Sequence, residues 1–235
     1  MPIVHPVTAT ATSPVQTDVL SPERRLSDAL RRHVEATPGT TAYLFVLVIV
    51  GIGLRLYSPT LVTELMRDSS TNWHNMSARP VLSLAASALW IDGDLFVWVP
   101  LMLLLLGFAE RRFGTRRCFA TFIGGHVGGT LASLVVVWDV ARNGGASARI
   151  IENTIDVGVS YGFYAVAASC CSLLARPWRT VVTVGLISWL GLGVLLSETF
   201  TGVGHLSAAL VGVVLPVWFA RRTAAKRRGA HLAVR

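Results

Sequence analysis

Six apolar segments, most of them long enough to cross a lipid bilayer, recur along this 235-residue chain. In hydrocarbon every backbone N–H and C=O group must be bonded within the protein, so such segments cross a membrane as helices. The predicted fold class is therefore an all-α membrane protein, a bundle of six transmembrane helices. The expected spans are residues 41–57, 95–109, 118–138, 157–175, 180–197 and 199–220.

Composition agrees with a membrane protein. Hydrophobic residues make up 52% of the chain and charged residues only 14%, whereas soluble domains carry about 25% charged residues. The mean hydropathy is +0.56. A formal charge of +8 would suit nucleic acid, but the sequence has neither zinc-finger spacing nor a Gly-rich phosphate loop. The basic residues fall mainly beside the apolar segments, so we expect no nucleic-acid partner.

Lysine and arginine are divided unevenly between the loops. They concentrate near both termini and in every second loop, within residues 111–117 and 176–179, while the other loops hold few. Cytoplasmic loops carry the excess of Lys and Arg. The distribution predicts a multi-pass protein of the plasma membrane with its N- and C-termini in the cytoplasm.

The chain divides into three expected regions. Residues 1–40 form a cytoplasmic segment, disordered at first and then an amphipathic helix at residues 21–36, for which Ser21 provides a cap. Residues 41–220 form the membrane domain, and residues 221–235 form a basic cytoplasmic tail.

The first outer loop, residues 58–94, is long and ends in an apolar stretch, residues 81–91. That stretch is too short to span a bilayer. We expect it to dip into the outer leaflet or to pack on the helix bundle.

A serine and a histidine are the candidate chemical groups. Ser160 lies near the start of the fourth span and His205 near the start of the sixth, and both spans enter the membrane from the same side. At 1.5 Å per residue the two lie within about 5 Å of a common depth. A histidine whose imidazole takes the hydroxyl proton turns serine into a nucleophile.

Small residues around this pair favour close helix packing. Gly158 and Gly162 flank the serine, and Ala208 and Gly212 follow the histidine at a four-residue spacing. Tyr164 lies one turn after the serine, where its ring is able to hold an imidazole. Each of these residues, taken alone, is also typical of ordinary helix packing.

His126 in the third span is a competing base. It lies deeper than the serine, so packing or an interhelical hydrogen bond is the expected use of its ring.

In these features the chain resembles the rhomboid family of intramembrane serine proteases, and most of all its divergent actinobacterial branch. The family has Gly-x-Ser-x at the start of span four, here residues 158–161, and a His followed by small residues in span six, here residues 204–212. A tyrosine one turn after the serine matches Tyr164. A Glu-x-x-x-Gly turn between spans two and three matches Glu110 and Gly114. The resemblance covers residues 41–220.

The resemblance implies that Ser160 is the nucleophile and His205 the general base and acid. It implies transmembrane proteins as substrates and requires no metal or cofactor. Gly158, Tyr161 and Tyr164 would support the site and its oxyanion.

The sequence departs from the family at the oxyanion donors. Many rhomboids carry a His and an Asn near the outer end of span two, where this chain has Asp94 and Trp98. An ionised aspartate does not donate a hydrogen bond. We expect Asp94 and Trp98 near the mouth of the cavity, with neither donating to the carbonyl that the serine would attack.

Two other functions remain open at this point. An inactive rhomboid that binds membrane proteins keeps the same fold, and only turnover of a substrate separates it from a protease. A small transporter or channel is disfavoured because the spans are poor in charge and lack an inverted repeat; flux into liposomes would indicate it.

Overall fold

The computed structural model of the protein describes residues 22–91, 93–143, 155–197 and 200–233. Within them all regular elements are helices. The chain divides into two units, one ending at Glu35 and one beginning at Ala36. The predicted disorder of the first nineteen residues and the expected cap at Ser21 lie outside the described residues.

The first unit contributes one helix, α1 (Pro22–Ala36). It begins at a proline, whose fixed φ suits the first helical position. The exposed side chains of Arg31 and Glu35, one turn apart, form an ion pair of 2.8 Å. Its expected contact with the membrane surface stays a prediction.

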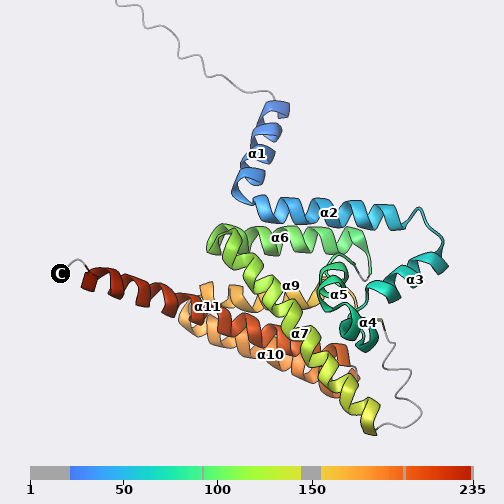
Figure 1. Ribbon diagram of the computed structural model, residues 1–235. Helices are drawn as coiled ribbons and strands as arrows, with labels where there is room; N and C mark the ends of the chain where they lie inside the picture. Colours follow the sequence, from blue (N-terminus) through green and yellow to red (C-terminus); the bar gives the residue numbers. More distant parts are fainter. Residues whose placement is uncertain (1–21, 92, 144–154, 198–199, 234–235) are drawn as a thin grey trace, which may run out of the picture. The chain divides into compact units, whose positions relative to one another are not determined.

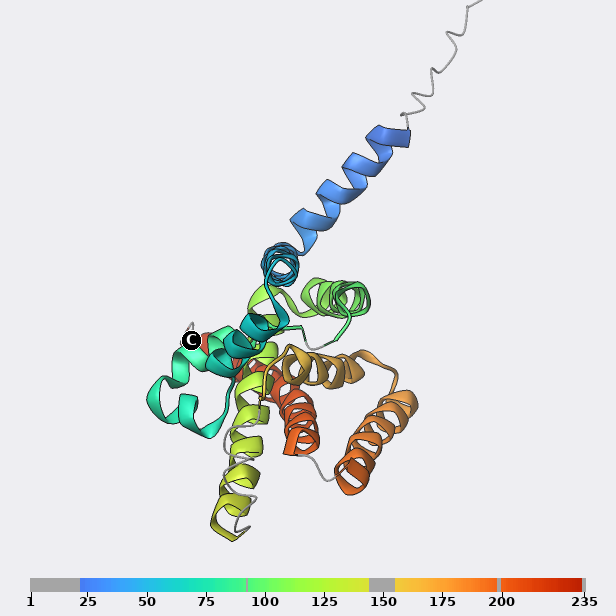
Figure 2. The same ribbon diagram turned by 90° about the vertical axis from the view of Figure 1, so that its right-hand side faces the viewer.

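The second unit is a helical bundle (Figure 1). Three helices pack against one another at its centre, α7 (Thr115–Asn143), α9 (Ser160–Cys170) and α11 (Phe200–Ala233). Helix α2 (Pro38–Leu54) lies beside α6 (Leu95–Phe113), and α10 (Arg176–Ser197) packs on α11 (Figures 1 and 2). The remaining helices are α3 (Pro59–Ser69), α4 (Trp73–Ala78), α5 (Pro80–Ser87) and the short 3₁₀ helix η2 (Cys171–Leu173).

Each of the six apolar segments contains a helix, but their lengths differ. Among the described residues, three helices are long and apolar enough to cross a membrane, α7, α10 and α11, or up to four if the end of α1 and α2 are counted together. Helix α2 has 17 residues, and α6 carries Glu110, Arg111 and Arg112 within its 19. The structure therefore supports a helical membrane protein, and the count of six spans stays a prediction.

Helix α9 is shorter than the predicted span of residues 157–175, and η2 continues the helical run to Leu173. The 11 residues of α9 cover about 16 Å at 1.5 Å per residue. Its neighbours explain the length: Tyr161, Ala165, Val166 and Ala168 are buried against the surrounding helices. A helix enclosed by protein does not have to reach both headgroup regions.

The membrane topology can be tested with reporter fusions. The Arg-rich turn after α6 and the connection between η2 and α10 should report cytoplasm, because both carry the arginine excess. A fusion within α4 should report the opposite side. A single inverted loop would contradict the six-span model.

The Glu110 carboxylate fixes the cytoplasmic turn expected between spans two and three. It accepts hydrogen bonds from the backbone N–H groups of Gly39 and Thr40, at 2.9 and 2.7 Å, and from the Thr115 hydroxyl at 2.7 Å. The first two amides belong to the start of α2, where a helix leaves its N–H groups without partners. Gly114 ends α6 with a φ of 81°, in the region that favours glycine.

Glu110 should make stability depend on acid. Burial alone raises the pKa of Glu110, but hydrogen bonds from Thr40, Thr115 and Gly39 outweigh it and hold that pKa below its ordinary value of 4.5. The stabilisation is therefore complete above pH 4.5 and is lost as the pH falls through the lower native pKa. Glu110→Gln should cost about 1–2 kcal/mol at neutral pH, and less below pH 4.5. Denaturant unfolding at several pH values measures this; Glu64→Gln, which changes an exposed carboxylate, should show neither effect.

The apolar stretch of the first outer loop packs on the bundle. The Tyr43 hydroxyl donates to the Ala88 carbonyl at 2.6 Å, and the Gly158 amide donates to the Ser87 carbonyl at 2.9 Å. Val81 and Leu82, near the start of α5, are 79% and 58% exposed. The expected packing is therefore observed, and contact of those two side chains with lipid stays a prediction.

Candidate active site

Ser160 and His205 meet between α9 and α11. Ser160 is the first residue of α9, and His205 lies in the second turn of α11. The Ser160 Oγ and His205 Nε2 atoms are 2.9 Å apart, within hydrogen-bond range. Both side chains are half-buried. The geometry that the shared depth predicts is present, and the catalytic roles stay predictions.

Gly158 lets the chain turn into α9 at this point. Its φ is 127°, which favours glycine over any residue with a side chain. Its amide is held by the Ser87 carbonyl of the first outer loop. The turn at Gly158 and its hydrogen bond to the loop thus fix the start of α9, where Ser160 lies.

Two tyrosine rings hold the imidazole. The Tyr164 ring centroid lies 4.8 Å from that of His205, and the Tyr161 ring meets His205 edge-on at 5.2 Å. Such aromatic pairs contribute about 0.5–1.5 kcal/mol beyond their buried area. Tyr164 therefore lies where the sequence predicts it. Tyr161 contacts His205 with its ring, and its hydroxyl bonds other residues.

Small residues allow α7, α9 and α11 to approach closely. A Cβ atom at Gly212 would overlap the Ala165 carbonyl, and one at Gly162 would overlap the Phe122 ring. Ala208 is fully buried against Tyr161 and Ala165. Gly212 lies against the Ala165 backbone and Gly162 against the Phe122 ring. We therefore expect the spacing between Ser160 and His205 to depend on these small residues.

Asp156 links this site to the first outer loop. Its carboxylate accepts from the Tyr161 hydroxyl at 3.0 Å and from the Thr71 hydroxyl at 3.1 Å. Its backbone N–H donates to Ser70 Oγ at 2.7 Å, and its carbonyl accepts from the Thr71 amide at 2.9 Å. The Tyr161 hydroxyl also bonds Ser133 of α7 at 2.8 Å. The ring beside His205 is therefore held by α7 and, through Asp156, by the connection between α3 and α4.

Burial and hydrogen bonding act in opposite directions on the pKa of Asp156. The residue lies just before the expected fourth span, and burial raises its pKa to about 6, while hydrogen bonds from Tyr161 and Thr71 oppose the rise. The carboxyl group accepts both bonds. The cluster was not predicted from the sequence; the available signal was an aspartate five residues before Tyr161 and a serine among the few polar residues of the third span.

His126 has a structural use. Its Nε2 atom lies 3.1 Å from Ser87 Oγ and 3.1 Å from the Leu84 carbonyl oxygen. The ring is buried between α7 and α5. The interhelical hydrogen bond expected for His126 is therefore present, between α7 and α5.

The positions that hold oxyanion donors in many rhomboids are used for structure here. Asp94 caps α6 by accepting from the Phe96 amide at 2.8 Å. The Trp98 ring packs edge-on against Phe163 at 5.5 Å. Asn75 in the outer loop donates to the Arg67 and Ser70 carbonyls. None of these contacts directs a donor toward Ser160.

A pocket of about 280 Å³ opens beside the histidine, between α9, α10 and α11. Tyr164 and His205 form one wall, and Trp189, Leu196 and Thr201 contribute to the others. Neither Asp94 nor Trp98 lines it. In the described part of the chain, no three His, Cys, Asp or Glu side chains gather in a way that could hold a metal ion.

The two tyrosines should respond differently to loss of their hydroxyl groups. Tyr161→Phe leaves the Asp156 carboxylate without one donor and should lower the free energy of unfolding by about 1–3 kcal/mol. Tyr164→Phe should change it by less than about 0.5 kcal/mol, since within the described residues its hydroxyl has no hydrogen-bond partner. Denaturant unfolding in detergent measures both. Equal losses would contradict a structural role for the Asp156 cluster.

Comparison with known proteins gives one match. A family model described as "Rhomboid-like protein" matches residues 32–224. Neither the curated proteins nor the solved structures contain a match to the chain. The matched range begins within α1, ends within α11 and includes every described helix between them.

Proposed function

Because the chain belongs to the rhomboid-like protein family, we propose that it is an intramembrane serine protease that cleaves transmembrane segments of other membrane proteins. The observation that carries the proposal is the 2.9 Å contact between Ser160 Oγ and His205 Nε2 at the start of two packed helices. Family membership makes the chain a rhomboid-type membrane protein. The proposed protease activity rests on Ser160 and His205.

The proposed reaction follows from the two side chains. Ser160 Oγ attacks the carbonyl carbon of the scissile peptide while His205 Nε2 takes the hydroxyl proton. His205 then gives that proton to the leaving amine as the C–N bond breaks. Water, deprotonated by the same imidazole, hydrolyses the acyl ester and restores the serine. No metal or cofactor takes part in these steps.

Backbone amides are the candidate donors for the oxyanion. Ser160, Tyr161 and Gly162 form the first turn of α9, so their N–H groups have no acceptor within the helix. No side chain caps this end. A helix N-terminus stabilises negative charge, and these amides are adjacent to the attacking hydroxyl. They would replace the side-chain donors that Asp94 and Trp98 do not supply.

The pocket beside His205 suits an apolar substrate. Leucine and tryptophan side chains of α10 face it, and the imidazole lies in its wall. An apolar side chain next to the scissile bond would fill this space while the bond lies near Ser160. We propose that the substrate segment contributes such a residue.

The test is cleavage in proteoliposomes. The purified full-length protein is reconstituted with a transmembrane substrate whose helix is weakened by Gly and Pro near its outer end. The protease proposal expects a single cleavage site near that end. Absence of any cleaved product across a panel of such substrates would contradict the proposal.

A second candidate is a rhomboid without activity that binds membrane segments. The use of Asp94 as a helix cap and of Trp98 as packing favours it, because losing an oxyanion donor costs on the order of a hundredfold in rate. This candidate expects the substrate segment to co-purify with the protein uncleaved, and equally with Ser160→Ala.

A further inference from the structure

A second cavity lies at the opposite end of the bundle from Ser160. It has a volume of about 320 Å³, the space of roughly ten water molecules. Side chains from α6, α7, α9, η2, α10 and α11 line it. Ser169, in its wall, is nine residues after Ser160 on α9, which is about 13 Å along the helix. The cavity is therefore separate from the proposed active site.

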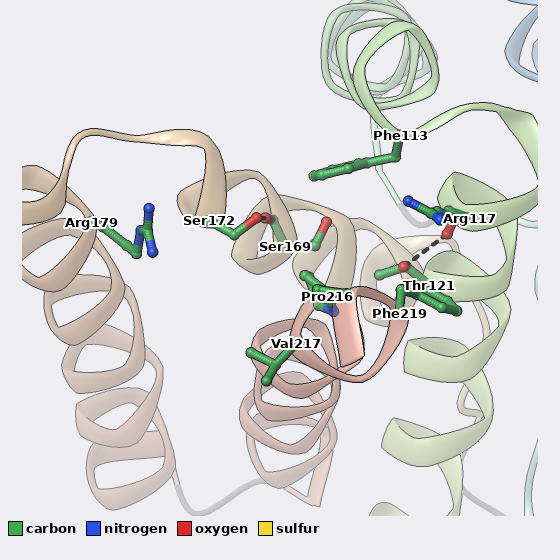
Figure 3. A pocket seen from close by; sticks show the side chains of 10 residues that line it. Phe113, Arg117, Thr121, Ser169, Ser172, Arg179, Pro216, Val217 and Phe219 are labelled. Carbon is green, nitrogen blue, oxygen red and sulfur yellow. Dashed lines mark hydrogen bonds between the residues drawn. The ribbon is translucent and has the colours of Figure 1, made fainter. Parts of the chain in front are cut away.

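Two arginines border the cavity. Arg117 comes from the first turn of α7 and Arg179 from the first turn of α10, and Figure 3 shows them on opposite sides with Ser169 and Ser172 between them. Among the residues that the structure describes, no carboxylate lines the cavity. The nearest acid in the α6–α7 turn, Glu110, already accepts three hydrogen bonds. The charge on the described lining of the cavity is thus positive.

Both guanidinium groups keep donors for a ligand. Arg117 donates to the Thr223 hydroxyl at 3.1 Å, and Arg179 donates to the Leu174 carbonyl at 3.3 Å. A guanidinium carries five N–H donors, and its planar fork matches phosphate oxygens. In the described part of the chain each guanidinium makes one hydrogen bond, and its other N–H groups remain for an anion. The Arg117 guanidinium also lies over the Phe219 ring, 5.8 Å from its centroid.

The remaining walls are apolar. Phe113, Pro216, Val217 and Phe219 line the cavity beside the arginines. A free phosphate ion would gain nothing from these side chains. A phospholipid would present its headgroup phosphate to the arginines and lay the start of its acyl chains on the apolar residues. The cavity lies at the end of the bundle that carries the arginine-rich loops, where the sequence predicts the cytoplasmic leaflet.

We propose that this cavity binds the phosphate group of an anionic phospholipid. Arg117 and Arg179 hold the headgroup, and the bound lipid bridges the ends of α6, α7, α10 and α11. Basic pockets between membrane helices on the cytoplasmic side are suited to anionic headgroups. The proposal is independent of the protease activity.

Native mass spectrometry of the full-length protein in neutral detergent tests it. Phosphatidylglycerol should bind as one tight equivalent, and phosphatidylcholine and inorganic phosphate should bind at least about tenfold more weakly. Equal binding of phosphatidylcholine would make the cavity a general lipid crevice. Equal binding of inorganic phosphate would make it a soluble-anion site. Either result overturns the proposal.

Paired double variants separate the cavity from general charge attraction. Arg117→Gln with Arg179→Gln should weaken phosphatidylglycerol binding about tenfold or more. Arg116→Gln with Arg176→Gln removes the same charge from exposed neighbours that do not line the cavity, and should weaken it less than about twofold. Equal losses in the two pairs would contradict the proposal.

A third variant covers the case in which the arginine pair fails to fold. Ser172→Phe fills the cavity without changing charge, because the Ser172 side chain borders the space between the arginines. It should weaken phosphatidylglycerol binding by a similar factor. Unchanged binding in this variant would contradict the proposal.

Discussion

Ser160→Ala and His205→Ala should each abolish cleavage of a transmembrane substrate, with turnover falling on the order of 10⁴-fold or more. The hydroxyl and the imidazole are 2.9 Å apart and act as one unit. Losing either member therefore removes nearly the whole effect, and the double variant should be no slower than the single ones. Turnover in proteoliposomes, measured at equal protein content, checks this.

Matched variants separate chemistry from folding. Ser169→Ala changes a serine of the same helix whose hydroxyl donates to the Val166 carbonyl. This variant should retain turnover within about threefold. His126→Ala should lower stability, because it breaks the contact with Ser87 and Leu84, while the folded fraction stays active. If Ser160→Ala turned substrate over at the wild-type rate, the proposed mechanism would be wrong.

Gly212→Ala should produce the second large effect, a loss of about a hundredfold in turnover. A Cβ atom at this position overlaps the Ala165 carbonyl oxygen, which is backbone and does not rotate away. Helices α9 and α11 must therefore move apart, and a displacement of about 1 Å between reacting groups costs about a hundredfold in rate. Overpacking of this kind also costs about 1–3 kcal/mol of stability. Turnover and denaturant unfolding measure the two losses.

Gly191→Ala is the control for that substitution. It lies on α10, and a Cβ atom there meets nothing within 4 Å. Because alanine is about 0.5–1 kcal/mol better than glycine inside a helix, this variant should be as stable as wild type or more so. Equal damage from the two substitutions would show that close contact between α9 and α11 does not position the pair.

Local sequence was sufficient to locate the pair. The start of each apolar segment sets the depth of its residues, so Ser160 and His205 could be assigned a common level before any contact was known. Helical spacing likewise assigned Tyr164 to the face of the serine. These inferences use only the rise and period of one helix at a time.

Contacts between distant parts of the chain could not be predicted in this way. Asp156 bonds Ser70 and Thr71, about 85 residues earlier, and Glu110 bonds the start of α2, about 70 residues earlier. Each contact depends on how loops return to the bundle. Helix α9 covers only part of the predicted fourth span, residues 157–175, and its packing between α7 and α11 likewise depends on distant parts of the chain.

Fluorophosphonate labelling tests the central claim most directly, since the reagent forms a covalent bond with a serine only when a base has activated it. The purified protein is treated with the probe, and the labelled peptide is sequenced by mass spectrometry. We expect one adduct, on Ser160, that is absent from Ser160→Ala and strongly reduced in His205→Ala. Absence of labelling in the wild type, or equal labelling in His205→Ala, would contradict the central claim.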